Sequence, residues 1–203
     1  MAAARCAPTT NSAVTFSLVG MPGSGKSTVG RQLARRLGMD FVDSDSVIEA
    51  RVGMSIREWF SQHGEEPFRD LEQDIIEELS GRAGIVLATG GGAVLRPSNR
   101  DALHSRTHVV YLRSTPEEVY RRLRHDTHRP LLQVDDPLSR LRELFRERDP
   151  LYRRAAHFVI EGARPSLHSL LGMVLMQLEL AGLVSPDRVP ATVGATAMPP
   201  AQT

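Results

Sequence analysis

The residues with the clearest chemical meaning lie between Gly20 and Ser27, where the sequence reads Gly-Met-Pro-Gly-Ser-Gly-Lys-Ser. Lys26 is the only lysine of the 203-residue chain, and all its other basic residues are arginines. The run matches the GxxxxGK[ST] phosphate loop, in which backbone N–H groups surround phosphates, the lysine neutralises them and the hydroxyl binds Mg²⁺. The motif therefore predicts nucleoside triphosphate binding; a glycine-rich turn in an unrelated fold is the alternative.

Two carboxylates, Asp43 and Asp45, follow the short apolar pair Phe41-Val42. On an extended segment, residues two apart point the same way, so both carboxylates could face one cleft. One could then order Mg²⁺ through water, and the other could accept hydrogen bonds from an alcohol. Both residues could instead cap the helix that follows.

Three glycines, Gly90 to Gly92, follow an apolar run at the expected carboxyl end of a strand, where ligands bind in open α/β sheets. Their backbone N–H groups could receive an anion or a hydroxyl, although a plain tight turn is equally open. Thr89 stands where an ordinary Walker B motif has an acidic residue. Arg69 and Arg148 suit bidentate recognition of a carboxylate or phosphate, with a solvated helix face as the alternative.

These residues need elements to position them, and short apolar runs alternate with helical patterns along the chain. We expect strands at 14–19, 41–42, 85–88, 109–112 and 158–160, and helices at 26–37, 67–79, 137–155 and 165–182. Ser55 with Glu58 forms a capping box for a further helix, and Thr115 begins another. The alternation predicts a three-layer α/β/α fold with a five-stranded parallel sheet.

Length and composition fit a single domain at 14–183 with disordered tails at 1–13 and 184–203, and a lid at about 125–136. A net charge of +1 argues against nucleic acid or a membrane surface as partner. The lone Cys6 rules out an intramolecular disulfide, and neither a signal peptide nor a membrane span is recognisable. We expect a cytoplasmic protein.

Taken together, these segments resemble the shikimate kinase family from about residue 14 to residue 180. The matching motifs, in family order and spacing, are the phosphate loop at 20–30, Asp43-Ser44-Asp45, Phe68-Arg69 with Leu71-Glu72, Thr89 to Val94, Arg129-Pro130-Leu131-Leu132 and Arg148-x-Pro150-Leu151-Tyr152.

The resemblance implies a P-loop kinase fold of the nucleoside monophosphate kinase type with a mobile lid. It implies ATP-dependent phosphorylation of the 3-hydroxyl of shikimate, on the pathway to chorismate and aromatic amino acids, with Mg²⁺ as cofactor. We expect a monomer whose partners are the small molecules shikimate and ATP.

Residue by residue, the resemblance implies that Ser27 binds Mg²⁺ directly and Asp43 binds it through water. Shikimate would be held by Asp45 at its hydroxyls, by Arg69 and Arg148 at its carboxylate, and by Gly91. The implied catalytic residues are Lys26, Asp45 and Arg129, the last arriving with the lid. The implied nucleotide-binding residues are Gly23, Ser24, Gly25, Lys26, Ser27, Thr28 and Arg129, with Arg122 and Arg164 as further candidates near the adenine.

Two alternatives stay open at this point. Another small-molecule kinase of the same fold, acting on gluconate or a nucleoside monophosphate, would not call for the pairs Asp43 with Asp45 and Arg69 with Arg148. A non-catalytic nucleotide-binding paralogue should have lost Lys26, Asp45 or an anchoring arginine, and the chain keeps them all.

Overall fold

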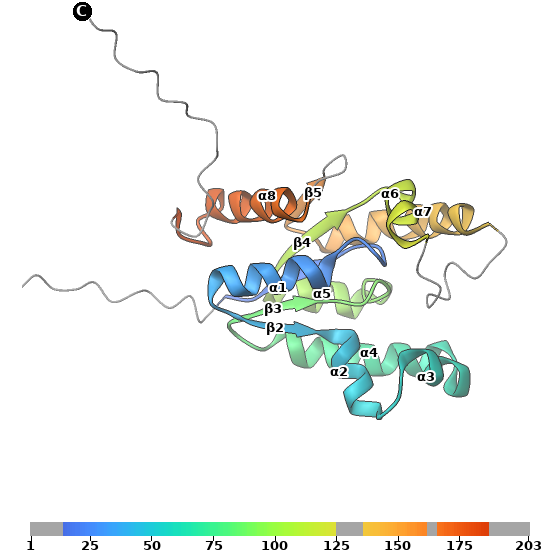
Figure 1. The fold of residues 1–203 in the computed structure, drawn as a ribbon. Coiled ribbons are helices and arrows are strands. Elements are labelled where there is room, and N and C mark those ends of the chain that lie inside the picture. The colour runs from blue at the N-terminus through green and yellow to red at the C-terminus, as the bar shows by residue number, and fades with distance from the viewer. Residues whose placement is uncertain (1–13, 125–135, 162–165, 187–203) are drawn as a thin grey trace, which may run out of the picture.

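Strands and helices alternate along most of the chain in the computed structural model, which describes residues 14–124, 136–161 and 166–186 (Figure 1). The strands are β1 (Phe16–Val19), β2 (Asp40–Asp43), β3 (Ile85–Ala88), β4 (His108–Arg113) and β5 (Phe158–Glu161). The helices are α1 (Lys26–Leu37), α2 (Ser44–Val52), α3 (Ile56–His63), α4 (Glu65–Ser80), α5 (Pro97–Arg106), α6 (Pro116–Leu123), α7 (Pro137–Ala155) and α8 (Leu167–Leu180). The expected lid, with Arg129, and the candidate Arg164 lie outside the described residues.

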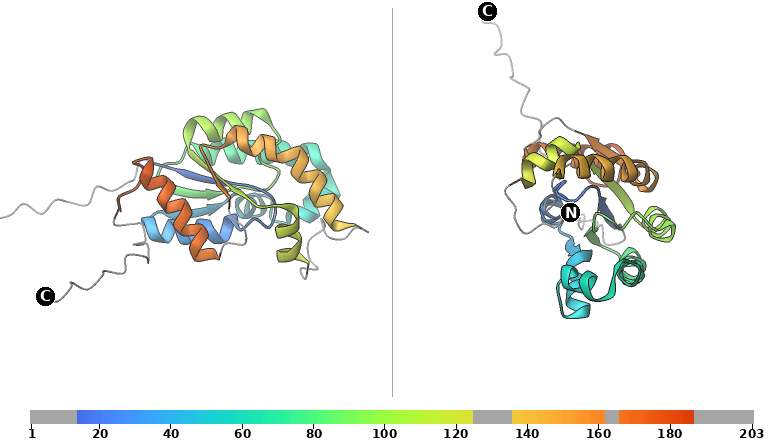
Figure 2. Two further views of the ribbon diagram at one scale, coloured as in Figure 1. Left: turned by 90° about the horizontal axis from the view of Figure 1, so that it is seen from above. Right: turned by 90° about the vertical axis from the view of Figure 1, so that its right-hand side faces the viewer.

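The five strands form one parallel sheet in the order β2-β3-β1-β4-β5, as expected. In β4, Val109 and Tyr111 point to one face and Val110 and Leu112 to the other, and all four are buried. Helices α1 and α8 cover one face, and α4, α5 and α7 cover the other (Figure 2). A parallel sheet buried on both faces explains why its strands read as continuous apolar runs.

The topology brings the predicted chemistry to one edge of the sheet. The carboxyl ends of β2, β3 and β1 are neighbours, with Asp43 paired to Ala88 and Leu18 paired to the same residue. The Asp43–Asp45 segment, the glycine triplet and the phosphate loop follow these three strands. They therefore meet at the edge where open α/β sheets bind ligands.

Local signals explain where the helices begin and end. Gly38 ends α1 with a left-handed φ of 68°, and its N–H donates to the carbonyl of Ala34. The capping boxes of Ser55 with Glu58 and of Thr115 with Glu118 are both present. The sequence predicts the first box, and it predicts Thr115 as an N-cap followed by Pro116, because these signals lie within one helical turn.

Two helices have no counterpart among the expected elements. Helix α2 begins directly after Asp43, so the segment 43–45 is not extended. Helix α5 buries the polar residues Asn99 and Arg100, which weakens its apolar pattern. Their side chains donate to the carbonyls of Ala93, Val94 and Leu95, so α5 supports the loop after the glycine triplet.

The C-terminal boundary expected after residue 183 needs a small correction. Val184 is buried and packs with the apolar residues between the sheet and α8. The rest of the expected tails lies almost entirely outside the described residues, so the division into domain and tails stays a prediction. None of the helices among the described residues is long and apolar enough to span a bilayer.

Candidate active site

The phosphate loop folds as an anion cradle. Gly20, Gly23 and Gly25 all have positive φ, at 148°, 79° and 97°. A Cβ on Gly23 would lie 2.5 Å from the Leu123 side chain of α6, so this position also needs glycine for space. The Lys26 ammonium is nearly buried and donates to the carbonyl oxygens of Gly20 at 2.9 Å and Met21 at 3.0 Å. The Lys26 side chain therefore folds back over the phosphate loop and binds its backbone carbonyls.

Ser27 and Asp43 lie together at the start of α1 and the end of β2. The Ser27 hydroxyl donates to Asp43 Oδ2 at 2.6 Å, while Asp43 Oδ1 accepts from the backbone N–H of Asp45 at 3.1 Å. Asp43 is thus the N-cap of α2, which was the alternative to a metal role, yet its second oxygen faces Ser27. Two adjacent hard oxygen donors fit Mg²⁺, which takes its remaining ligands from water and phosphate.

Asp45 lies in the first turn of α2 and packs against Gly90, which corrects the expectation of an extended segment. Burial, and next the neighbouring Asp43 carboxylate, raise the pKa of Asp45 to about 6, with Lys26 opposing them. Glu72 and Glu49 add smaller contributions that also raise it. A carboxylate with a pKa near neutrality is suited to accept a proton.

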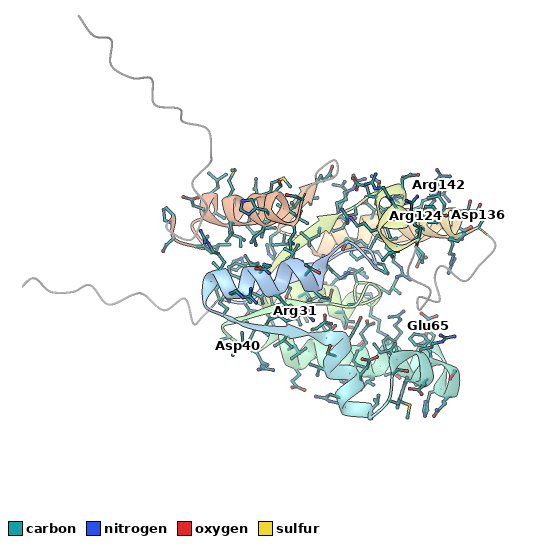
Figure 3. All side chains as sticks on the ribbon, in the orientation of Figure 1. Arg31, Asp40, Glu65, Arg124, Asp136 and Arg142 are labelled. Atoms are coloured by element: carbon teal, nitrogen blue, oxygen red, sulfur yellow. The ribbon has the colours of Figure 1, made fainter. Side chains whose placement is uncertain are left out.

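Arg69 lies on α4 with 12% of its side chain exposed, held between carboxylates and rings. Its Nη1 donates to Glu72 at 2.6 Å, and its Nε and Nη2 donate to Glu65 at 3.2 and 3.0 Å. The guanidinium also lies over the ring of Phe68, 5.2 Å from its centroid. Figure 3 places Glu65 at the same end of the molecule as Arg124, the residue before the expected lid, and Asp136, the last residue of that lid.

Arg148 lies on α7 and contacts the glycine triplet at Gly91. Its Nη1 donates to the carbonyl of Gly91 at 3.2 Å. Its Nε is buried and has no hydrogen-bond partner within the described part of the chain. A buried cationic donor without an acceptor is costly unless a ligand supplies one.

Gly90 to Gly92 form a turn, called here the glycine turn, whose backbone makes one wall of the site (the glycine wall). A Cβ on Gly90 would lie 2.6 Å from Asp45 Oδ1, and a Cβ on Gly91 would lie 2.7 Å from the Pro22 ring. A Cβ on Gly92 would overlap the guanidinium of Arg69. None of the three glycines has positive φ, so close approach, and not backbone conformation, requires them.

Arg122 is an exposed residue of α6 that nevertheless contacts the phosphate loop. Its Nη1 lies 3.2 Å from Ser114 Oγ and 3.4 Å from the carbonyl oxygen of Ser24 in the phosphate loop. The candidate is therefore beside the expected nucleotide, while its contact with adenine stays a prediction.

Sequence reasoning gave no role to three buried residues that build the site. Ser44 is fully buried and accepts from the Gly90 N–H at 3.0 Å. Glu72 is almost fully buried against Arg69, and burial raises its pKa against the pull of that guanidinium. Tyr152 is fully buried and donates to Gly91 O at 2.6 Å. The helical spacings 69 to 72 and 148 to 152 were signals that could have found the last two.

Comparison with known proteins agrees with this geometry. The family model described as shikimate kinase matches residues 22–178. The chain belongs to the shikimate kinase family. A shikimate kinase from Paracidovorax citrulli is 59% identical over 178 residues, covering 86% of this chain and 97% of the relative. One from Burkholderia thailandensis is 56% identical over 172 residues, covering 85% and 94%.

Solved shikimate kinases share the fold as well. The structure of the Acinetobacter baumannii shikimate kinase in complex with shikimate superposes with a TM-score of 0.79 at 43% identity, covering 85% of this chain and 96% of that one. The expected family, α/β fold and kinase activity are therefore confirmed. The roles of single residues stay predictions.

Proposed function

We propose that this cleft carries out the reaction of the shikimate kinase family, transfer of the γ-phosphoryl group of ATP to the 3-hydroxyl of shikimate. The observation that carries the assignment is the order of side chains along one glycine turn. Asp45 lies against Gly90, Arg148 donates to Gly91 and Arg69 lies against Gly92. An acceptor that fits this turn has hydroxyls at one end and a carboxylate at the other.

On the nucleotide side, the phosphate loop and the N-terminus of α1 cradle the phosphates, with backbone from Gly23 to Thr28. Lys26 leaves the carbonyls of its own loop and neutralises the β- and γ-phosphates. Ser27 and Asp43 would hold Mg²⁺, which when bound neutralises charge on the phosphates. Arg129 would add a further positive charge from the lid.

On the acceptor side, the two arginines, which lie beside Gly91 and Gly92, fix the carboxylate of shikimate. Arg148 brings a buried Nε without a partner, and Arg69 must release Glu65 to free a pair of parallel donors. Gly91 offers backbone without obstruction. Together these contacts would orient the ring so that one hydroxyl points toward the phosphate loop.

Asp45 accepts hydrogen bonds from the hydroxyls at the reacting end. With a pKa raised to about 6, it is ionised at pH 7 yet basic enough to take the proton of the attacking hydroxyl. Phosphoryl transfer passes through a loose transition state that asks little of a base. Positioning is therefore the larger part of its role.

The proposal also includes two properties of the whole protein: that it is a monomer and that it is cytoplasmic. All the proposed site residues come from a single chain, which suits a monomer. The single Cys6 suits a cytoplasmic enzyme in a reducing compartment. Sedimentation of the purified enzyme with both substrates tests the first of these, and a mass above one chain would overturn it.

Release of ADP measured with shikimate, shikimate methyl ester, gluconate and AMP tests the acceptor assignment. We expect rapid release with shikimate alone, and at least a hundredfold lower kcat/KM with the ester, because the ester cannot engage both guanidinium groups. Arg69→Lys and Arg148→Lys should each raise KM for shikimate about tenfold with KM for ATP nearly unchanged. Comparable turnover of gluconate or AMP would overturn the assignment.

A further inference from the structure

Tyr152 is a buried polar residue to which the reaction described above assigns no role. It lies on α7, one helical turn after Arg148, and its side chain is fully buried. Its hydroxyl donates to the carbonyl oxygen of Gly91 at 2.6 Å. Arg148 Nη1 donates to the same oxygen at 3.2 Å. One backbone acceptor therefore joins the tyrosine, the arginine and the glycine turn.

The shared acceptor has a geometric consequence. The Gly91 carbonyl and the Gly92 N–H belong to one planar trans peptide, so they point in opposite directions. Holding the carbonyl toward α7 therefore aims the Gly92 N–H away from α7. The turn is closed by the Ala93 N–H donating to the Gly90 carbonyl at 3.2 Å, and because glycine restricts its backbone little, the bond from Tyr152 adds a constraint on the peptide in the middle of that turn.

The Arg148 guanidinium gains an equally specific constraint. Because Tyr152 supplies the shorter bond to Gly91 O, the oxygen stays where Arg148 Nη1 can reach it. That contact limits the rotation of a long side chain whose Nε otherwise has no partner within the described residues. Burial raises the pKa of Tyr152, so its hydroxyl stays protonated and remains a donor across the working pH range.

The Tyr152 ring is also held in place by its packing against β4. It packs against the ring of Tyr111 in β4, with centroids 5.0 Å apart. The Tyr111 hydroxyl donates to Asp149 at 2.9 Å, and Arg113 and Arg153 donate to the same carboxylate. Ring and hydroxyl are therefore held between the sheet and α7.

We propose that Tyr152 is a positioning residue for the acceptor site, which holds the Gly91 carbonyl and through it orients the Arg148 guanidinium and the glycine turn. The proposal rests on the proposed function, because it takes Arg148 and Gly91 to bind shikimate. It adds a residue that touches neither substrate and yet sets the affinity for one of them.

The chain offers a matched control for this test. Tyr152→Phe and Tyr111→Phe each delete one hydroxyl from the same pair of packed rings, and Asp149 keeps two arginine donors when Tyr111 changes. We expect Tyr152→Phe to raise KM for shikimate about five- to twentyfold, with KM for ATP within twofold of wild type. We expect Tyr111→Phe to leave both KM values within twofold.

Two further measurements separate positioning from loss of packing. Tyr152→4-aminophenylalanine keeps a donor at the ring position of the hydroxyl, whereas Tyr152→4-methylphenylalanine keeps the size without the donor. Only the first should restore KM for shikimate, and this comparison holds even if Tyr152→Phe folds poorly. In the Arg148→Lys background, Tyr152→Phe should raise KM for shikimate by a smaller factor than in the wild type, because part of its effect passes through Arg148.

Different outcomes would contradict the role of Tyr152 and the role of Arg148. An unchanged KM for shikimate in Tyr152→Phe, equal losses for both substrates, or equal behaviour of the amino and methyl variants would overturn the role of Tyr152. If Arg148→Lys itself leaves KM for shikimate unchanged, Arg148 does not bind the acceptor, and the proposed placement of shikimate at the glycine turn fails.

Discussion

At the residue scale, the site holds the Asp45 carboxylate in a position where its negative charge lowers the stability of the fold. Asp45 is packed against backbone at Gly90 and lies near Asp43 and Glu72, and together with burial these neighbours raise its pKa to about 6. A folded-state pKa above the unfolded value means that ionisation opposes folding. The stability lost is largest above pH 6 and disappears as the pH falls below about 4.

This cost gives a prediction with opposite signs for stability and activity. Asp45→Asn should raise the free energy of unfolding of the ligand-free enzyme at pH 7 by about 1–3 kcal/mol, because it removes a buried charge. The same change should lower kcat at least tenfold. Chemical denaturation at pH 7 and at pH 4.5 checks the first part, since the gain should shrink at the lower pH. An Asp45→Asn enzyme with unaltered kcat would contradict the assigned role.

Lys26 carries the second prediction at this scale. Lys26→Ala should leave a folded protein whose kcat falls at least a hundredfold, a loss of about 3 kcal/mol of transition-state stabilisation. Lys26→Arg should fail as well, because a planar fork does not replace a point charge in this loop. The Lys26 ammonium lowers the pKa of Asp45, so the residual activity of Lys26→Ala should also need a higher pH. Retention of a tenth of the wild-type rate would contradict the role.

At the scale of elements, prediction from sequence worked where the signal is local. Signals that lie within one helical turn were predicted correctly: the phosphate loop, the bounds of α1 and α7, the capping box of Ser55 with Glu58, and Thr115 as the N-cap of α6. The start of α2 at Ser44 and the buried polar face of α5 depend on contacts with distant segments. The candidate site was predicted as a set of residues, but the mutual contacts of the glycine wall are tertiary and could not be read from spacing.

The glycine turn itself gives a prediction with a control on another element. Gly91→Ala should reduce kcat/KM for shikimate at least thirtyfold and lower stability by about 1–3 kcal/mol, because its Cβ would lie 2.7 Å from the Pro22 ring. Gly172→Ala in α8 meets nothing within 4 Å and should be neutral or slightly stabilising. Thermal unfolding and kinetics on both variants check this. An active, stable Gly91→Ala enzyme would show that the loop can move away.

At the scale of the whole molecule, the two ends of the sheet respond to pH in opposite senses. At the amino ends of β4 and β5, the rings of His104 and His157 stack 4.2 Å apart, with His108 at an angle to the second. His157 Nδ1 accepts from the Val109 N–H at 3.0 Å, so this ring is neutral in the folded state. Burial, with smaller contributions from His104 and His108, lowers the pKa of His157.

The sign of this second effect follows from the lowered value. The unfolded chain binds a proton at His157 below about pH 6.5 while the folded protein does not, so stability should fall as the pH drops from 6.5 toward the folded-state pKa. Urea unfolding of wild type and His157→Gln between pH 5 and 7 measures it. The variant should show a flatter slope in this window, and identical slopes would remove the histidine cluster as the cause.

The glycine wall also bears on how this enzyme could acquire a new specificity. One side of the acceptor site consists of backbone at Gly90 to Gly92, where every added side chain would meet Asp45, Pro22 or Arg69. A substitution on that side must therefore push against the Pro22 ring or displace Asp45 or Arg69, two side chains that the proposed site needs. A change of acceptor would then depend on substitutions of Arg69 and Arg148. Each of these is tied to a further residue, because Arg69 donates to Glu72 and Arg148 donates to the same Gly91 carbonyl as Tyr152. The number of evolutionary paths leading away from the present substrate is correspondingly small.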